Sequence, residues 1–410
     1  MNILHIINSM NPINGGPSQG IRNLNLAMMD MGVTREAVCL DSPYSPYLDN
    51  KEQLKIHAVG PGLGPWHYSK NMKPWLEANM GRFDMVIVNG LWTYHSYAAI
   101  KVFNKLKKRS PEKMIQLFVM PNGMLDPYFQ RAKERRLKAI RNWVYWKLVE
   151  RNVVNKADGL LFTCETELLL ARETFSRYKP KKEYNVGYGV ASPPVYNQEM
   201  SSAFSAKCPG LGEAPYLLFL SRIHQKKGVD LLIEAYKQLY TEFKANNKEI
   251  PKLVIAGPGL DTQYGKSLQK QLESFPEVKA SVFFPGMLEG DAKWGAFYNC
   301  QAFVLPSHQE NFGIAVAEAL ACGKPVLISN QVNIWREIES DKGGIIKDDT
   351  MAGTLSMLRE WLNMTNEEQM NMGRDALKTY HNHFTILTAA NKLITILSLQ
   401  RKGNYKTIPE

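Results

Sequence analysis

The sequence predicts an α/β protein made of two Rossmann-like domains followed by a C-terminal helical tail. Short apolar runs alternate with amphipathic segments of helix length, which is the pattern of parallel α/β architecture. A stretch rich in Gly, Pro, Ser and Asn at 188–214 interrupts this alternation, which then begins again. The length of 410 residues fits two or three domains at about 150 residues per domain.

The first half of the chain holds enough alternating segments for one such domain, which we expect to span 1–190. The apolar runs expected to form strands are Asn2–Ile7, Ala37–Leu40, Asp84–Asn89, Met114–Val119, Gly159–Cys164 and Tyr184–Val186. The segments expected to form helices are 17–31, 66–80, 95–108, 131–156 and 165–174. Residues 191–214 lack periodicity and are expected to be a linker.

The second half repeats the pattern, and we expect a second domain at 215–383. Its expected strands are Tyr216–Leu220, Leu253–Ala256, Val282–Phe284, Ala302–Leu305 and Val326–Ser329. Its expected helices are 228–245, 262–274, 289–298 and 313–322, and residues 352–402 are expected to be helical. Two such halves leave a cleft between them, where ligands usually bind.

Composition excludes several classes of protein. Hydrophobic residues make up 44% and charged residues 22%, which are ordinary values for a packed globular protein. No apolar run approaches the ~20 residues of a membrane span, and Ile3–Ile7 is too short for a signal peptide. Five scattered Cys without a CxxC pair argue against a disulfide framework, so we expect a reducing, cytoplasmic compartment.

The net charge of +11 is concentrated in one segment. Residues 101–156 hold fifteen Lys and Arg against four acids, which accounts for the whole surplus. A basic segment of this kind suits an anionic membrane surface, an acidic polysaccharide or a nucleic acid. Nucleic-acid binding through 101–156 is the non-enzymatic alternative. It would not account for the motifs in the second half of the chain, so no nucleic-acid partner is expected.

Segment 131–156 has helical spacing with two apolar faces. One stripe is expected to face the core and comprises Leu137, Ile140, Val144 and Leu148. The opposite face mixes apolar residues with cations and comprises Trp146, Val149, Val153, Arg135 and Lys138. This second face suits an interfacial helix in peripheral contact with anionic lipid. The structural alternative is a solvated basic face with Trp146 covered by a neighbouring loop.

Two motifs near the N-terminus fit their usual functions poorly. Gly16–Gly20 matches the GxSxG pattern of hydrolases and, with Gly15, is similar to a dinucleotide fingerprint. A nucleophile elbow needs a tight turn directly after a strand, but roughly seven residues separate Ile7 from Gly15. The same long loop and the glycine spacing disfavour a dehydrogenase. A Gly/Pro turn that opens a helix is the structural alternative.

No metal site is expected. His381 and His383 lie two residues apart without a third ligand at metal spacing, and the sequence has no Asp-x-Asp clamp. If a nucleotide binds to this chain, protein cations and helix N-termini must therefore balance its charge.

Three segments of the second half carry the candidate chemistry. The first, Phe219–Gly228, leaves the carboxyl end of a strand and places Arg222 and Lys227 five residues apart, where they can hold a diphosphate. The second, Ile255–Gly259, is a strand that ends in a glycine-rich turn. A solvated basic loop is the structural alternative for the first segment.

The third segment, Pro306–Val326, is the most specific. A strand is expected to end before it, Gly313 frees the backbone, and a helix follows whose first N–H groups form an anion site. Glu318 lies inside that helix, where its carboxylate can accept hydrogen bonds from ribose hydroxyls. Glu310 precedes the helix and is expected to face sugar hydroxyls.

Together with the loop at Gly15 and Gly16, the pair Arg222/Lys227 and the motif Glu310-x7-Glu318 resemble the retaining glycosyltransferases of family 4, which have the GT-B fold. The resemblance covers nearly the whole chain. It implies two Rossmann-like domains facing across a deep cleft, with a last helix, about 384–401, that packs back on the first domain. It also implies a nucleotide-sugar donor, which is a substrate, and neither cofactor nor metal.

The resemblance also assigns roles to residues. Those matching Arg222 and Lys227 contact the donor diphosphate, and the one matching Glu318 binds ribose. The hexose is held by Glu310 and the backbone that follows, which comprises Asn311, Phe312, Gly313 and Ile314. Gly16, after Gly15, lets the first domain approach the phosphate and sugar.

This sequence departs from the family at one position. Many relatives have Pro-His-Gly-Met-Leu after the strand that ends at Val119, and their His points at the donor sugar. Here Asn122 occupies that place in Pro121–Leu125, and an amide can hydrogen-bond a hydroxyl but cannot hold a proton. Any acid–base role at this catalytic position is therefore in doubt. His95 is a candidate for sugar or acceptor contact, with a plain His at a helix start as the alternative.

The resemblance favours a retaining hexosyltransferase of polysaccharide biosynthesis. UDP-glucose is the leading donor, and the acceptor is expected to be a glycan or a lipid-linked glycan, which suits association with the cytoplasmic face of a membrane. A GT-B nucleotide-sugar epimerase is the enzymatic alternative, although it needs acid–base carboxylates in the first domain that the sequence does not locate. A phosphorylase would require a pyridoxal-binding Lys.

Overall fold

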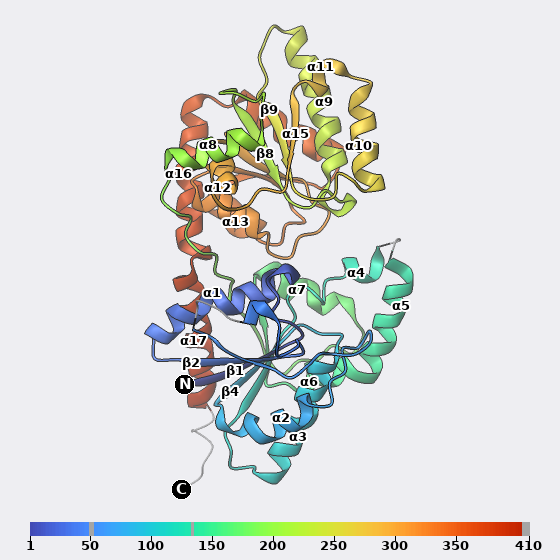
Figure 1. Ribbon diagram of the computed structural model, residues 1–410, viewed down its shortest axis with the longest axis vertical. Helices are drawn as coiled ribbons and strands as arrows, with labels where there is room; N and C mark the ends of the chain where they lie inside the picture. The colour runs from blue at the N-terminus through green and yellow to red at the C-terminus, as the bar shows by residue number, and fades with distance from the viewer. Residues whose placement is uncertain (49–52, 133–134, 404–410) are drawn as a thin grey trace. The chain divides into compact units, whose positions relative to one another are not determined.

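The computed structural model describes residues 1–48, 53–132 and 135–403, and they form two compact units (Figure 1). Unit 1 comprises 1–190 together with the segment from Ile386 onward, and unit 2 comprises 191–385. Each unit has one parallel β-sheet. None of the described helices is long and apolar enough to cross a membrane.

Unit 1 contains a seven-stranded sheet in the order β3-β2-β1-β4-β5-β6-β7. Its strands are β1 (Asn2–Ile7), β2 (Thr34–Cys39), β3 (Lys55–Ala58), β4 (Met85–Asn89), β5 (Gln116–Met120), β6 (Gly159–Phe162) and β7 (Glu183–Asn185). Its helices are α1 (Gly16–Asp30), α2 (Met72–Asn79), α3 (Tyr94–Arg109), α4 (Tyr128–Arg131), α5 (Arg136–Tyr145), α6 (Arg151–Lys156), α7 (Glu165–Thr174) and α17 (Ile386–Gly403).

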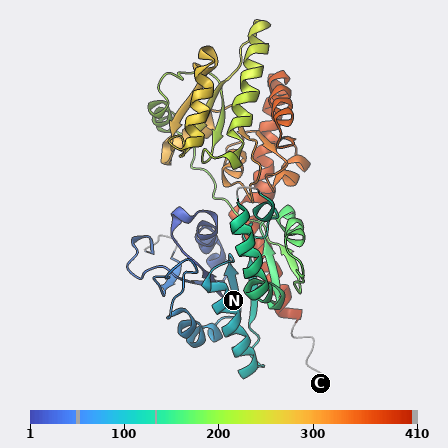
Figure 2. The ribbon, with the colours of Figure 1, turned by 90° about the vertical axis from the view of Figure 1, so that its right-hand side faces the viewer.

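The two faces of the unit 1 sheet bury different helices because side chains alternate along a strand. Leu4 and Val86 belong to the core that includes residues of α2, α3 and α6. Ile3 and Ile87 belong to the opposite core, together with Leu393 of α17. Helix α17 therefore completes unit 1, to which the red end of the described chain returns (Figures 1 and 2).

Unit 2 contains a six-stranded sheet in the order β10-β9-β8-β11-β12-β13. Its strands are β8 (Tyr216–Leu220), β9 (Lys252–Ala256), β10 (Val282–Gly286), β11 (Ala302–Leu305), β12 (Val326–Ser329) and β13 (Gly344–Lys347). Its helices are α8 (Gln198–Lys207), α9 (Val229–Ala245), α10 (Gln263–Glu273), α11 (Pro276–Lys279), α12 (Gly290–Asn299), α13 (Ile314–Ala321), α14 (Trp335–Ser340), α15 (Met351–Asn363) and α16 (Asn366–Thr379).

The expected linker at 191–214 contains a helix. Helix α8 begins where the side chain of Asn197 accepts a hydrogen bond from the N–H of Met200. It packs so closely on α12 that a Cβ at Gly295 would lie 2.0 Å from the carbonyl oxygen of Met200. Burial of Met200 and Phe204 stabilises this helix. Its ten residues are mostly polar, so the local sequence alone does not predict it. Only the remainder of the segment lacks regular structure.

Strands β3 and β13 were not expected, and both lie at sheet edges. The helix expected over 66–80 begins only at Met72, because the backbones of Leu63 and Tyr68 pair in a turn.

The orientation predicted for helix 131–156 is wrong. The stripe expected in the core is exposed and comprises Leu137, Ile140, Val144 and Leu148. Instead Trp146 and Val153 are buried, in a π-helical turn (Trp146–Glu150) and in α6. The ring of Trp146 stacks on Phe175 with centroids 4.7 Å apart, and its Nε1 donates to the carbonyl of Ser176 at 3.0 Å. These contacts decide which apolar face is inside.

Glu150 ends this turn with a fully buried carboxylate. Its Oε1 accepts hydrogen bonds from the N–H of Trp92 at 2.7 Å and the hydroxyl of Ser96 at 2.8 Å. Among the residues that the structure describes, its Oε2 has no partner. Burial raises the pKa of Glu150 from 4.5 to about 7, and the two hydrogen bonds only partly oppose this.

We expect Glu150→Gln to change how stability depends on pH. A carboxyl whose pKa is raised by folding takes up a proton when the chain folds, so wild-type stability should fall as pH rises from about 4.5 through about 7. Gln cannot ionise, so above pH 7 the variant should be more stable by up to about 3 kcal/mol. Urea unfolding followed at pH 5 and pH 8 measures the difference, with the exposed Glu112→Gln as the control. An equal effect of Glu150→Gln at both pH values would contradict the linkage.

Candidate functional site

Three loops of unit 2 follow three neighbouring strands. The loop with Arg222 and Lys227 follows β8, the turn Gly257–Gly259 follows β9, and the segment with Glu310 follows β11. Strand β8 lies between β9 and β11, and all three are parallel. Because the carboxyl ends of parallel strands lie at one edge of a sheet, the three segments converge there as the sequence predicts.

Backbone hydrogen bonds join these loops. The N–H of Ile223 donates to the carbonyl of Pro258 at 2.8 Å, which joins the first loop to the second. The carbonyl of Lys226 accepts from the N–H of His308 at 2.8 Å and from the hydroxyl of Ser307 at 3.0 Å, which joins the first loop to the third. The three loops therefore form one hydrogen-bonded assembly.

Two glycines allow this close approach. Gly228 has φ +66°, and a Cβ on it would lie 2.0 Å from the carbonyl oxygen of Pro306. Gly257 has φ +136°, and a Cβ there would lie 1.9 Å from the carbonyl oxygen of Ser221. Neither position can hold another residue without moving a neighbouring loop.

The charged side chains of the assembly form two ion pairs. Lys227 is buried, and its Nζ pairs with Oε2 of Glu310, whereas Arg222 is exposed. Lys293 of α12 pairs with Glu318 of α13, with 2.8 Å between Nζ and Oε1. Sequence reasoning missed Lys293, because nothing in its local sequence distinguishes it from a solvated helical lysine. It identified Arg222, Lys227, Glu310 and Glu318, but it predicted neither of the two ion pairs.

The backbone around Glu310 is held by the loop after β12. Its N–H donates to the carbonyl of Gln331 and its carbonyl accepts from the N–H of Asn333, each at 2.9 Å. Phe312 is buried edge-on against Phe384, with ring centroids 5.5 Å apart. Glu310 is therefore anchored on both sides of its Cα.

Gly313 caps α13 in the left-handed conformation, with φ 80°. The carbonyl of Gly313 accepts from the N–H groups of Val316 and Ala317. Ile314 begins the helix, so Asn311, Phe312 and Gly313 form the bend into its positive end. This geometry suits the predicted anion site.

Three of the four predicted site residues of unit 1, namely Gly15, Gly16 and Asn122, lie at two turns. Gly15 is exposed with φ +85°, and Gly16 begins α1 with its carbonyl accepting from the hydroxyl of Tyr188 at 2.7 Å. Asn122 follows β5 with φ +53°, and its Nδ2 donates to the carbonyl of Met120 at 2.9 Å. The amide of Asn122 is thus partly engaged by its own turn.

Glu167 of α7 holds that turn in place. Its Oε1 accepts from the N–H of Gly123 at 2.6 Å, and its Oε2 accepts from the N–H and hydroxyl of Thr163. The carboxylate is buried and thereby links the end of β6 to the residue after Asn122. An acidic residue on a helix gives no sign of this role in the sequence.

The predicted sugar contact at His95 is not supported by its surroundings. The ring is buried in the first turn of α3. Its Nε2 lies 3.0 Å from the carbonyl oxygen of Asn89, and its Nδ1 lies 2.7 Å from Oγ1 of Thr93. Burial lowers the pKa of His95 to about 4. The ring is therefore a neutral structural group, which agrees with the alternative interpretation of a helix-start His.

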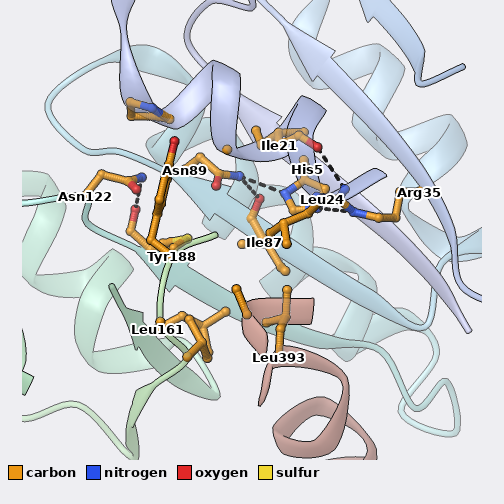
Figure 3. A pocket seen from close by; sticks show the side chains of 16 residues that line it. His5, Ile21, Leu24, Arg35, Ile87, Asn89, Asn122, Leu161, Tyr188 and Leu393 are labelled. Carbon is orange, nitrogen blue, oxygen red and sulfur yellow. Dashed lines mark hydrogen bonds between the residues drawn. The ribbon is translucent and has the colours of Figure 1, made fainter. Parts of the chain in front are cut away.

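Unit 1 also has a narrow, partly open cavity of about 30 Å³, which is lined by residues of its sheet, α1 and α17 (Figure 3). Arg35 is buried beside it, donating to the carbonyl of Ile21 and to Nε2 of His5, whose pKa is lowered by burial and by Arg35. Asn122 and Tyr188 also contribute to the lining. The space suits about two water molecules rather than a hexose.

No group of three or more His, Cys, Asp or Glu among the described residues is arranged to hold a metal ion. His381 and His383 lie in a π-helical turn (Tyr380–Phe384) rather than a loop. Nε2 of His383 lies 3.1 Å from a carboxylate oxygen of Asp341.

Comparison with known proteins finds sequence similarity mainly in the second unit. Residues 205–379 match the family model "Glycosyl transferases group 1". An uncharacterised glycosyltransferase of Methanocaldococcus jannaschii is 33% identical over 129 residues, or 32% of this chain and 30% of that protein. A D-inositol 3-phosphate glycosyltransferase of Gordonia bronchialis is 28% identical over 233 residues, or 55% of this chain and 49% of that protein. The matches therefore span about half or less of these relatives.

Comparison of structures covers nearly the whole chain. Anabaena HepE in complex with UDP and glucose aligns with a TM-score of 0.70 at 14% identity, over 97% of this chain and 99% of that one. At this identity the likeness establishes the fold alone. Residues 205–379 are thus similar in sequence to group 1 glycosyl transferases, and the chain as a whole has the GT-B fold of two Rossmann-like domains.

Proposed function

We propose that this protein is a retaining glycosyltransferase of family 4 that transfers a hexose from a nucleotide sugar. The observation that carries the proposal is the loop assembly after β8, β9 and β11, in which the loop of Arg222 and Lys227 is joined to the segment that leads into α13 and Lys227 pairs with Glu310. Cations, a positive helix end and a carboxylate are the groups that a diphosphate joined to a sugar requires. The match of 205–379 to group 1 glycosyl transferases supports this assignment.

Each charged group has a distinct part in the proposed reaction. Arg222, Lys227 and the first N–H groups of α13 bind the diphosphate and stabilise the charge that develops as it leaves. Glu318 accepts hydrogen bonds from the ribose, with Lys293 holding its carboxylate in place. Glu310 accepts hydrogen bonds from the hexose and is oriented by its backbone contacts and by Lys227.

The transfer itself is a front-face displacement. The acceptor oxygen bonds to the anomeric carbon on the face from which the diphosphate departs, so the anomeric configuration is retained. The bond between that carbon and the diphosphate oxygen breaks, and the leaving diphosphate takes the acceptor proton. Asn122 is limited to hydrogen bonding, because an amide cannot carry that proton.

We propose UDP-glucose as the donor and a glycan or lipid-linked glycan as the acceptor. Among the similar structures, HepE was solved with UDP and glucose, which supports a uridine donor for this chain. Arg222, Lys227 and the positive end of α13 can stabilise the diphosphate, and the sequence has no Asp-x-Asp clamp, so we also propose a metal-independent reaction.

The direct test measures nucleotide release. A panel of nucleotide sugars is first ranked by thermal shift, and the best donor is then incubated with candidate glycans in the presence and absence of EDTA. We expect the enzyme to release UDP at the same rate with and without EDTA. NMR of the product should show that the transferred sugar keeps the anomeric configuration of the donor. Inverted product, or UDP binding that EDTA abolishes, would refute the corresponding part of the proposal.

Lys227→Ala should weaken UDP binding by about 1.5–3 kcal/mol, the size of a hydrogen bond to a charged group. Isothermal titration calorimetry measures this change. Lys244→Ala is the matched control, because Lys244 is an exposed lysine that pairs with Glu277 outside the loop assembly. An unchanged dissociation constant for Lys227→Ala would show that Lys227 does not contact the diphosphate.

A further inference from the structure

Helix α5 and the π-helical turn after it present a row of large apolar side chains to solvent. Leu137 is 85% exposed, Ile140 61% and Leu148 71%, and Val144 and Trp143 are each more than two-fifths exposed. Four of these five recur at the i, i+3, i+7 and i+11 spacing of one helix face. We call Leu137, Ile140, Trp143, Val144 and Leu148 the outer stripe.

The outer stripe is not the unfinished side of a core. The opposite face of the same segment is already packed, through the stack of Trp146 on Phe175 and the buried carboxylate of Glu150. The segment therefore has a fixed orientation, and contiguous exposed apolar surface of this kind marks an interaction site.

The segment that carries the outer stripe is also basic. Between residues 135 and 149 the chain has no acidic residue and five basic ones, namely Arg135, Arg136, Lys138, Arg141 and Lys147. Within the described part of the chain, none of the five forms an ion pair with an acid. The Nζ of Lys147 lies 3.5 Å from the ring centroid of Trp143, so apolar and cationic groups share one surface.

We propose that this surface docks on a membrane that contains anionic lipid, with the outer stripe in the interfacial region and the cations at the lipid phosphates. The chemistry favours this occupant over two others. A soluble polyanion would satisfy the cations but leave five apolar side chains in water. A second copy of the chain would cover the apolar groups but bring two sets of five cations together. A bilayer surface accommodates both features.

The proposal does not depend on the sugar-transfer activity. It differs from the sequence-based expectation in the residues that enter the lipid, because Trp146 and Val153, expected to do so, are buried. The segment from Arg136 to Glu150 would lie along the surface for roughly 22 Å at 1.5 Å per residue. It would act as a peripheral contact and not as a span.

Co-sedimentation with vesicles tests the proposal. We expect the wild type to pellet with phosphatidylglycerol–phosphatidylcholine vesicles at low salt, and far less with phosphatidylcholine alone. The double variant Leu137→Ser/Leu148→Ser should lower partitioning at least tenfold. The triple variant Arg136→Gln/Lys138→Gln/Arg141→Gln should lower it about 100-fold, since each cation near an anionic surface contributes about fivefold.

Matched control variants show whether the loss of vesicle binding is specific to substitutions in this surface. Leu63→Ser/Met370→Ser removes two exposed apolar side chains elsewhere, and Lys207→Gln/Lys244→Gln/Lys279→Gln removes three exposed cations of unit 2. Both sets should partition like the wild type, and all variants should keep the wild-type circular dichroism.

Three outcomes would overturn the proposal. The first is wild-type protein that stays in the supernatant with anionic vesicles at low salt. The second is loss of binding in the cation variant but not in the leucine variant, which indicates a polyanion site. The third is a concentration-dependent dimer, seen by analytical ultracentrifugation without vesicle binding, that Leu137→Ser/Leu148→Ser abolishes, which indicates a second copy.

Discussion

Glu310→Ala should lower kcat/KM for sugar transfer about 100-fold while UDP still binds. The proposed hydrogen bond between a carboxylate and a hexose hydroxyl accounts for about 1.5–3 kcal/mol, which corresponds to about 10- to 150-fold in rate. UDP lacks the hexose, so its affinity should be little changed. Since Glu310 pairs with Lys227, its removal frees that lysine for the diphosphate, so any change in UDP affinity should be a gain and not a loss.

Glu318→Ala provides the contrast for this experiment. Glu318 is proposed to bind ribose, so its loss should weaken UDP itself, measured by calorimetry alongside the rate of transfer. If Glu310→Ala lowers UDP affinity and leaves turnover intact, while Glu318→Ala does the opposite, the two roles are reversed.

Gly228→Ala should destabilise unit 2 by about 3 kcal/mol and weaken UDP binding as well. The left-handed conformation of an L-residue costs about 1–2 kcal/mol, and the new Cβ would meet the carbonyl oxygen of Pro306 at 2.0 Å. Relieving the clash must separate the loop of Lys227 from the loop of Glu310. Thermal unfolding and calorimetry measure the two effects.

Gly212→Ala is a control that separates the cost of the left-handed backbone conformation from the cost of the clash with Pro306. Gly212 has φ +61°, close to the +66° of Gly228, but a Cβ on it would meet nothing within 4 Å. Its replacement should therefore cost only about 1–2 kcal/mol, from the left-handed conformation alone, and leave UDP affinity unchanged. Equal destabilisation by the two substitutions would show that the contact with Pro306 is unimportant.

The inner strands could be predicted from the sequence, but the edge strands could not. Strands such as β8 and β11 are buried on both faces, so they appear as continuous apolar runs. Strand β3, Lys55–Ala58, is partly exposed, and β13 begins at a glycine. Both pair on one side only, and short edge strands carry too little apolar sequence to be recognised.

Sequence periodicity located the amphipathic helix at 131–156 but could not orient it, because both faces carry apolar residues. The buried face is set by Phe175 and Ser176, which contact Trp146 although they lie about thirty positions away in the sequence.

The candidate site was likewise predicted only in part. The rule that parallel strands end at one edge predicted that the loops converge, whereas the pairs of Lys227 with Glu310 and Lys293 with Glu318 join residues 83 and 25 positions apart.

The return of α17 to unit 1 makes unit 2 an insertion within a discontinuous domain. A chain synthesised from its N-terminus has produced all of 191–385 before Ala390, Leu393 and Leu397 exist to fill the core of unit 1. Unit 2 can therefore complete its fold while the core around Ile3 and Ile87 still lacks the side chains that α17 supplies. The sheet face of unit 1 that packs against α17 is therefore the last part of that unit to receive its packing partners during translation.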